Sequence, residues 1–289
     1  MPQKIAFQGE EGANSHIAIK DVYPDAIALP YTTFDECFAA IQSGEADLGM
    51  IPIENTLAGR VADIHHLLPN SDLHIVGEYF LPIQFQLMAL PGTTLSDIKT
   101  VYSHVHALGQ CREIIRRNGW QGVVAADTAG SARMVSQSND KSMAALAPRL
   151  AAERYGLEIL AEDVEDAAHN TTRFVILSPE EDWAESGAGK TVTSFIFKVR
   201  NIPASLYKAL GGFATNNINM TKLESYQIEG QFVATQFYAD VEAHPDDQSL
   251  KLAFEELGFF SAGGSVRVLG VYPAHPFRSQ QERNRALSK

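Results

Sequence analysis

The sequence has only two cysteines, no long hydrophobic run and no excess of basic residues, and each shortage excludes a class of protein. Cys37 and Cys111 stand alone in the chain, so no paired spacing for zinc or redox chemistry is present and reduced thiols are expected. No apolar stretch approaches the roughly 20 residues that a membrane span requires. Residues 1–12 become polar too early to hold the apolar core of a signal peptide. We therefore expect a cytoplasmic protein.

The shortage of basic residues gives a formal net charge of -12 at pH 7. Nucleic acids and anionic membranes attract basic proteins, so neither is expected as a partner. If the substrate is itself an anion, local donors such as arginine side chains, helix N-termini and backbone amides must bind it against the overall field. The polar tail at 276–289, which includes Arg278, is expected to be disordered rather than part of a site.

What the sequence does contain is an alternation of apolar strand segments, polar turns and amphipathic helices over residues 1–178. This alternation predicts an α/β fold with parallel sheets covered on both faces. Thr33 and Glu36 form a capping box that begins one of the helices. The β-rich segment at 74–90 is suited to carry the chain into a second lobe, which we place at roughly 82–160.

An acidic, glycine-containing segment at 179–190 predicts a linker, and the pattern changes after it. Residues 191–275 follow the order strand, helix, strand, strand, helix, strand, which is the βαββαβ order of a ferredoxin-like unit. The length of 289 residues is in keeping with at least two domains. We expect the edge strands of the second domain to pair across a dimer.

The strongest candidate for a site is the stretch in which a polar run ends in the apolar strand Phe174–Leu177. Thr172 and Arg173 would lie at the mouth of that strand. A guanidinium there can grip a carboxylate with two hydrogen bonds, and a hydroxyl can donate beside it. An ordinary strand threonine and a solvated arginine are the plainer interpretation, and these two residues alone leave both open.

Further polar side chains are expected near strand ends. Glu54, Asn55 and Thr56 follow a buried strand, at the carboxyl edge where open α/β sheets bind ligands. Ser103 ends another strand, and Gln110 lies about two turns into the single long helix that follows it. Turn residues and a solvated helix face are the alternatives, which the residues themselves do not exclude.

Histidine pairs do not complete a metal site. His65 and His66 are adjacent on a predicted helix, so their side chains point apart, and no third ligand keeps a recognisable spacing. We expect both at the surface. His104 and His106 lack a partner for either metal binding or general base chemistry.

Taken together, several motifs resemble one family. They are Pro52-Ile53-Glu54-Asn55-Thr56, Ser103-His104 with Gln110-Cys111, Asp127-Thr128-Ala129 with Ser131-Ala132, and Thr172-Arg173-Phe174. In their order, spacing and co-occurrence, the chain resembles monofunctional prephenate dehydratases along nearly its whole length. The resemblance implies a two-lobed, type II periplasmic-binding-protein-like catalytic domain at 1–178, followed by a regulatory ACT domain at 191–275.

The resemblance also implies an activity, the conversion of prephenate to phenylpyruvate with loss of carbon dioxide and water in L-phenylalanine biosynthesis. The family uses no metal and no organic cofactor. Thr172 matches the family's essential threonine, Arg173 its carboxylate binder, and Asn55, Ser103 and Gln110 the polar groups of its cleft. The supporting positions would be Glu54, Thr56, Thr128 and Ser131, with Phe174 in an apolar wall that excludes water.

In the ACT domain, the family's Gly-Ala-Leu segment is replaced by Ala204-Ser205-Leu206, and Glu-Ser-Arg-Pro by Glu224-Ser225-Tyr226-Gln227. Leu206, Asn217, Asn219 and Glu224 are still expected to form the dimer-interface pocket typical of ACT domains. L-Phenylalanine is the expected effector, and a homodimer or homotetramer the expected assembly.

Two alternatives remain open. An arogenate dehydratase would make phenylalanine directly from the amino analogue of prephenate. A non-catalytic sensor would keep the two-lobed fold and bind a carboxylated metabolite, because fold alone does not imply function.

Overall fold

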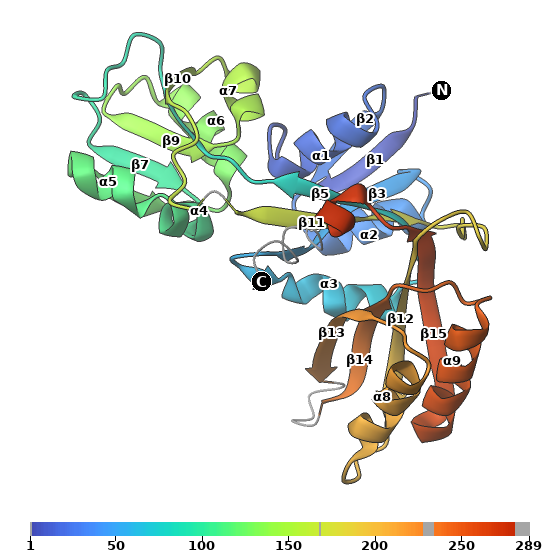
Figure 1. Cartoon of the computed structure of the whole chain (residues 1–289). Coiled ribbons are helices and arrows are strands. Elements are labelled where there is room, and N and C mark those ends of the chain that lie inside the picture. Colours follow the sequence, from blue (N-terminus) through green and yellow to red (C-terminus); the bar gives the residue numbers. More distant parts are fainter. Residues whose placement is uncertain (1, 168, 228–233, 281–289) are drawn as a thin grey trace. The chain divides into compact units, whose positions relative to one another are not determined.

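The computed structural model describes residues 2–167, 169–227 and 234–280 (Figure 1). Its contacts divide the chain into two compact units. The first unit is formed by Met1–Val61 and Tyr79–Phe174, and the second by Ala62–Glu78 and Val175–Lys289. Two lobes are distinguished by their sheets, and the first unit holds all of lobe 2 and most of lobe 1, because strands β5 (His74–Pro82) and β11 (Thr171–Ser178) of the lobe 1 sheet cross the unit boundary. The chain passes between the lobes twice, before β6 (Gln86–Ala89) and after β10 (Glu158–Ala161).

Lobe 1 is built on a sheet with the strand order β2-β1-β3-β11-β5, to which a short β4 adds at β3. β1 pairs in parallel with both β2 and β3, as the alternation predicted. The capping box is confirmed, because Glu36 N donates to Thr33 Oγ1 at 3.2 Å and the Glu36 carboxylate accepts from Thr33 N. The elements are β1 (Lys4–Gln8), α1 (Asn14–Val22), β2 (Ile27–Tyr31), α2 (Phe34–Gln42), β3 (Leu48–Asn55), β4 (Gly59–Arg60), β5 (His74–Pro82) and β11 (Thr171–Ser178).

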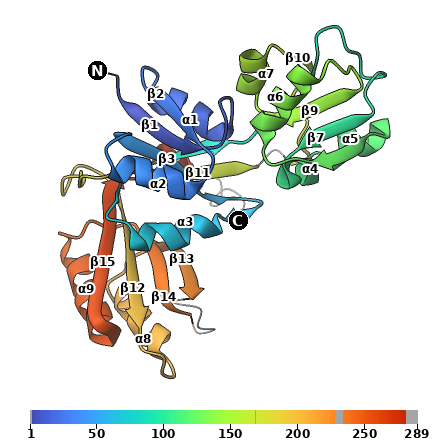
Figure 2. The same ribbon diagram turned by 180° about the vertical axis from the view of Figure 1, so that it is seen from behind.

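Lobe 2 has the strand order β10-β6-β9-β7-β8. Figures 1 and 2 show α4 and α5 on one face of this sheet and α6 and α7 on the other. The remaining elements are β7 (Thr100–Ser103), α4 (Val105–Gln110), α5 (Arg112–Asn118), β8 (Gln121–Val124), α6 (Thr128–Ser138), β9 (Met143–Ala147) and α7 (Arg149–Tyr155).

The prediction of purely parallel sheets is wrong for lobe 2. β7 pairs in parallel with β8 and β9, but β6 pairs antiparallel with β9 and β10. The reason lies in the connections. β6 follows β5 without an intervening helix and lies between β9 and β10, the two strands joined by α7, so it runs against both of them.

The second unit carries an antiparallel sheet with the order β13-β14-β12-β15. The order along the chain is the βαββαβ pattern predicted for 191–275. α8 and α9 cover one face, and Phe195, Phe197 and Phe213 fill the core between helices and sheet. The elements are β12 (Thr191–Val199), α8 (Ser205–Thr215), β13 (Met220–Gln227), β14 (Ala234–Val241), α9 (Gln248–Phe260) and β15 (Ser261–Pro273).

Two expectations fail within the second unit. His65, on α3 (Ala62–Leu67) ahead of the 3-10 turn η1 (Leu68–Asn70), is buried and lies edge-on against the Tyr238 ring, 5.4 Å between centroids. Arg278 is not in a disordered tail. Its guanidinium donates to both carboxylate oxygens of the buried Glu78, at 2.6 and 2.8 Å. Sequence composition could not show this because the partner lies 200 residues away.

None of the helices in the described ranges is both long and apolar enough to cross a membrane. A cytoplasmic location stays a prediction.

Candidate active site

Asn170, directly before β11, joins two other side-chain amides. Its Nδ2 donates to Gln110 Oε1 at 2.5 Å, and its Oδ1 accepts from Asn55 Nδ2 at 2.7 Å. Gln110 ends α4 in lobe 2, whereas Asn55 ends β3 in lobe 1. A single side chain that is only 3% exposed therefore connects both lobes.

The orientation of the Asn55 amide is fixed by the backbone. Its Oδ1 accepts from Leu57 N at 2.9 Å and from Ala58 N at 2.8 Å, so its Nδ2 must face the other way. There it donates to Asn170 and, at 2.9 Å, to Thr172 Oγ1. Because the Thr172 oxygen accepts this bond, its own proton is left to donate elsewhere. We call the chain Gln110–Asn170–Asn55–Thr172 the amide relay.

Thr56 fastens the turn after β3 to the start of β11. Its backbone N donates to Thr171 O at 3.0 Å, and its Oγ1 accepts from Thr171 N at 2.9 Å and donates to His169 O at 2.9 Å. The expected convergence of these two strand ends is thus present, and it holds Asn55 against Thr172.

Gln110 is held by a break in the helix that was predicted to be continuous. α4 ends at Gln110 and α5 begins at Arg112. Asp166 N donates to Gln110 O at 2.6 Å, and the Asp166 carboxylate accepts from Arg112 N and Glu113 N at 2.9 and 3.1 Å. The segment that leads to Asn170 therefore grips the helix end that carries Gln110.

Comparison with known proteins decides what this arrangement belongs to. The family model for prephenate dehydratase matches residues 5–182. The chain is 49% identical over 274 residues to a bifunctional N-acyl-homoserine lactone acylase/prephenate dehydratase of Komagataeibacter europaeus, covering 95% of this chain and 97% of that protein. The chain belongs to the prephenate dehydratase family.

Two other relatives are named for arogenate dehydratase and prephenate dehydratase activity. Arogenate dehydratase 2 of Petunia hybrida is 36% identical over 286 residues, with 94% of this chain and 72% of that protein covered. The solved prephenate dehydratase of Arthrobacter aurescens, in complex with L-Phe, superposes with a TM-score of 0.85 at 29% identity, over 98% of this chain and 99% of that one. The chain is accordingly an enzyme of the prephenate dehydratase class rather than a non-catalytic sensor.

The side chain of Arg173 does not lie beside that of Thr172. Successive strand residues point to opposite faces, and Arg173 is 3% exposed, with Nη1 donating to Glu54 Oε1 at 2.9 Å. Its guanidinium carbon lies 6.0 Å from the centre of the Phe80 ring. The two site candidates Arg173 and Glu54 form an ion pair in which Arg173 is buried and the Glu54 side chain is 34% exposed. The expected grip of Arg173 on a substrate carboxylate stays a prediction.

Several other predicted site residues have structural partners. Ser103 is fully buried and its Oγ donates to Leu146 O at 2.6 Å, so it ties β7 to β9. Ser131 is buried and donates to Asp127 O at 2.7 Å. Phe174 is 1% exposed within the core. Thr128 is half-buried at the first position of α6, where Asp127 caps the helix. The structure brings together Asn55, Thr172 and Gln110, through a residue the sequence analysis did not single out.

That residue is Asn170, and the sequence holds a signal for it. A short amide side chain stands immediately before β11, at the strand end where Thr172 was expected to act. Nothing in the sequence shows that its partner is Gln110, 60 residues earlier.

Two titratable groups lie at the ends of α4, which carries Gln110: His104 before it and Cys111 after it. Burial lowers the pKa of His104, and the neighbouring His106 lowers it further, so the ring is neutral at pH 7. Burial raises the pKa of the Cys111 thiol, which therefore stays protonated and is no nucleophile. Among the described residues, no three His, Cys, Asp or Glu side chains gather closely enough to hold a metal ion. Hydroxyl and amide hydrogen bonds are the chemistry that the site presents.

Replacing Asn170 with leucine should interrupt the amide relay. The change keeps the side-chain size but removes the donor to Gln110 and the acceptor for Asn55, so the link from Gln110 to the Asn55–Thr172 pair is lost. We expect kcat to fall about 10- to 100-fold, the range for a misplaced catalytic group, in a steady-state assay of prephenate turnover. Asn170→Asp is the control, because Gln110 can rotate its amide and donate to the carboxylate. Equal losses in both variants would contradict a role for the relay.

Proposed function

We propose that this enzyme converts prephenate to phenylpyruvate, carbon dioxide and water, with the Thr172 hydroxyl aimed at the departing hydroxyl of the substrate. The observation that supports this role most directly is the 2.9 Å bond from Asn55 Nδ2 to Thr172 Oγ1. A hydroxyl whose oxygen accepts from a fixed amide keeps its own proton free to donate away from that amide.

The reaction needs one proton for each dianionic prephenate consumed. The bond from the ring to its carboxylate breaks, and its electron pair completes the aromatic ring as the carbon–oxygen bond to the hydroxyl breaks. The hydroxyl leaves with the proton as water. Because aromatisation supplies much of the driving force, the enzyme's task is to hold the two leaving groups in position. Threonine is a very weak acid, so Thr172 acts as a positioned donor rather than a free-standing proton source.

A direct assay tests the proposal. Enzyme dialysed against EDTA is mixed with prephenate, and phenylpyruvate is measured by its absorbance in alkali. A parallel reaction with arogenate is followed by chromatography of the phenylalanine formed. Faster turnover of prephenate supports the proposal. A preference for arogenate would favour the activity named for the Petunia relative, and turnover of neither substrate would reject both.

We infer that the βαββαβ body is an ACT domain that binds L-phenylalanine. A pocket of about 250 Å³ lies at the start of α8, and the Arthrobacter relative was solved with L-Phe. The lining of this pocket includes Ala204, Ser205 and Leu206, together with Val199, Arg200, Asn201, Ile202, Tyr207 and Phe237. The pocket can regulate catalysis only if the effector binds one arrangement of the enzyme more tightly than another.

Four further residues proposed for the effector site lie outside that pocket lining. Asn217 has a positive φ of 54° in the turn after α8, a conformation that asparagine tolerates. Asn219 Nδ2 donates to Glu242 Oε2 at 2.6 Å. Glu224 and Ser225 lie on β13, opposite Tyr238 and Phe237 of β14. A second copy of the chain could complete the site with these residues, so we propose a homodimer or homotetramer, which light scattering would test.

The backbone conformation of Ala204, which lines the pocket at the start of α8, can be tested by substitution. Ala204 has a φ of 60°, where an L-residue costs about 1–2 kcal/mol relative to glycine. Ala204→Gly should therefore relieve strain, offset by about 0.4–1 kcal/mol of extra freedom in the unfolded chain. We expect stability to rise by up to about 1 kcal/mol in thermal unfolding. A loss of stability would show that the turn is not strained by the alanine.

We propose N-acyl-homoserine lactone hydrolysis as a second candidate activity. Its support is the 49% identity to the bifunctional Komagataeibacter protein over nearly the whole of both chains. Incubation with an N-acyl-homoserine lactone and detection of free homoserine lactone by mass spectrometry tests it. No release by enzyme that turns over prephenate would reject this second activity alone.

A further inference from the structure

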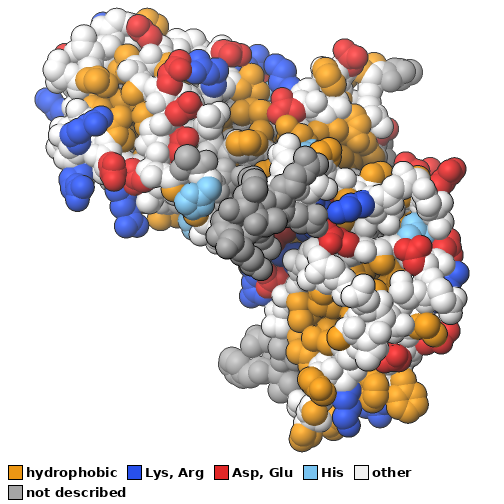
Figure 3. All heavy atoms as spheres, viewed as in Figure 1, with side chains coloured by type: hydrophobic (Ala, Val, Ile, Leu, Met, Phe, Trp, Pro, Cys, Tyr) orange, Lys and Arg blue, Asp and Glu red, His pale blue; other side chains and the backbone are white. Residues whose placement is uncertain are grey.

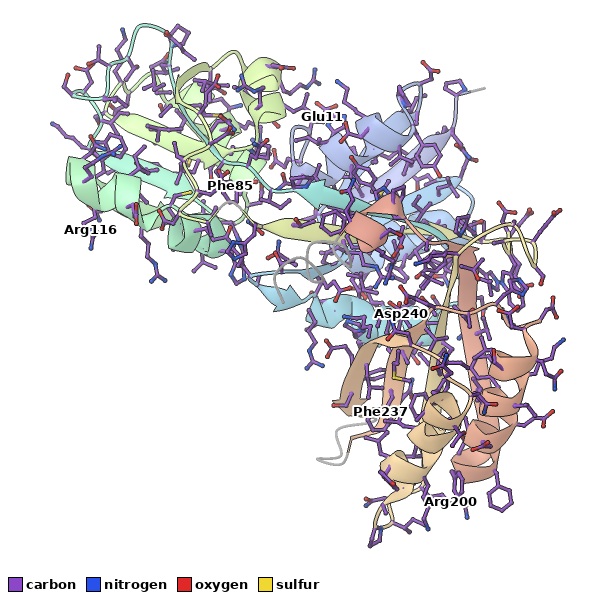
Figure 4. All side chains as sticks on the ribbon, in the orientation of Figure 1. Glu11, Phe85, Arg116, Arg200, Phe237 and Asp240 are labelled. Atoms are coloured by element: carbon purple, nitrogen blue, oxygen red, sulfur yellow. The ribbon has the colours of Figure 1, made fainter. Side chains whose placement is uncertain are left out.

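The turn between β1 and α1 contacts lobe 2 through bonds that are separate from the amide relay. Arg133 on α6 donates through Nε and Nη2 to the two carboxylate oxygens of Glu10, at 2.5 and 2.6 Å. Arg154 on α7 donates to the Glu11 carboxylate, and Tyr155 OH donates to Glu11 O at 2.9 Å. Figure 4 labels Glu11 at this turn. We call the two ion pairs Glu10–Arg133 and Glu11–Arg154 the inter-lobe clamp.

The backbone of the turn packs closely on lobe 2. Gly12 has a φ of 91°, and a Cβ placed on it would lie 2.8 Å from the Cα of Ala151. Gly12 N donates to His16 Nδ1 at 3.0 Å, which holds the turn against α1. The two lobes therefore meet here without a side chain between their backbones, and the clamp is an ordered contact rather than a chance approach of long side chains.

The position of the clamp matters for an anionic substrate. β1 and β3 are parallel neighbours, so the turn after β1 lies on the same sheet edge as Asn55. Two carboxylates at this edge would repel a dicarboxylate, in a protein whose net charge is already -12. Figure 3 shows acidic and basic side chains intermixed on the face of lobe 2 in view, so local pairs govern the field there. Pairing with Arg133 and Arg154 neutralises both carboxylates.

We propose that Glu10, Glu11, Arg133 and Arg154 are positioning residues that hold the two lobes together around the bound substrate and cancel the negative charge at its edge. This inference rests on the proposed function, since it takes the substrate to be a dicarboxylate. The ion pairs are about half-exposed, and an exposed pair changes an equilibrium by up to about fivefold. The clamp therefore acts on substrate binding and not on the chemical step.

Replacing the arginine or the glutamate of the Glu11–Arg154 pair should raise KM by different amounts. Arg154→Met opens the clamp and leaves Glu11 charged, so KM for prephenate should rise about fivefold while kcat changes less than about twofold. Glu11→Gln opens the same pair but also removes a repelling charge, so its KM should rise less. Arg149→Met is the matched control. Arg149 lies on the same helix but pairs with Glu162 within lobe 2, at 2.8 Å, so its loss should leave KM unchanged.

Exchanging the two charges of the pair tests the ion pair itself rather than either residue alone. The double variant Glu11→Arg with Arg154→Glu restores an ion pair of opposite direction and should recover most of the wild-type KM. An unchanged KM in Arg154→Met, or a swap as impaired as the worse single variant, would overturn the proposal.

A second measurement does not depend on turnover. Dyes on Asp25→Cys in lobe 1 and Arg117→Cys in lobe 2 report the distance between the lobes by energy transfer, since both positions are exposed and the native cysteines are buried. Adding Arg133→Met and Arg154→Met should lower the transfer efficiency. Unchanged efficiency would reject the clamp even in an active enzyme. An enzyme inactive on prephenate that nevertheless shows the drop would reject the proposed substrate and keep the clamp.

Discussion

Thr172→Val should lower kcat for prephenate by at least about 100-fold, because removing one hydrogen-bond donor aimed at a developing charge costs about 10²–10³ in kcat. Valine keeps the shape of threonine and replaces only the hydroxyl. The hydroxyl's bond to the departing oxygen strengthens as that oxygen leaves, so KM should stay within about threefold of the wild-type value. Steady-state kinetics of phenylpyruvate formation measure both parameters.

Two controls make this result specific. Thr172→Ser keeps a hydroxyl within reach of Asn55 Nδ2 and should retain most of the activity. Thr100→Val makes the same chemical change at a half-buried strand position in lobe 2, where the hydroxyl has only a 3.5 Å contact with Ser142 O, and should leave kcat unchanged. If Thr172→Val raised KM and spared kcat, Thr172 would be a binding residue and the proposed donor role would be wrong.

The position of Asn55 at a sheet edge could be predicted from the sequence, because polar residues at the carboxyl ends of strands in open α/β sheets lie there. Its 2.9 Å contact with Thr172 needs more than that rule, since Thr172 lies at the amino end of the neighbouring strand β11. The βαββαβ order of the second unit was predictable for a similar reason, since each of its elements has a local periodicity.

The side-chain direction of Arg173 is a further point on which the sequence was informative. The alternation of side chains along a strand already implies that Arg173 and Thr172 point to opposite faces, but the family resemblance favoured a shared role. The buried bond from Arg173 to Glu54 supports the opposite-face interpretation.

Hydrogen bonds between residues far apart in the chain could not be predicted from the sequence. The helix break at Gln110 depends on Asp166, and the burial of Ser103 depends on the carbonyl of Leu146. Hydrogen bonds of this kind leave no periodic trace, because each requires only one suitably placed polar atom in a distant segment.

Arg278 is a third example, and its replacement should have the largest effect on stability. The Glu78 side chain is fully buried, and Arg278 supplies two of its charge-assisted hydrogen bonds while also donating to Thr221 Oγ1 at 3.2 Å. Removing one partner of a buried ion pair costs about 3–5 kcal/mol, because a charge is left in a poorly solvated site. We expect Arg278→Met to lower the melting temperature of the transition that includes the second unit by about 6–20 °C in calorimetry.

A comparison with a solvent-exposed ion pair tests whether burial causes the loss of stability in Arg278→Met. Arg149→Met removes a guanidinium from an ion pair with Glu162 in which both side chains are at least half-exposed, so the melting temperature should change by less than about 3 °C. Adding Glu78→Gln to Arg278→Met removes the buried charge itself, and part of the lost stability should return. If the double variant were less stable than Arg278→Met, the carboxylate would be held mainly by its other partners, such as the 3.1 Å bond from His275 N, and not by Arg278.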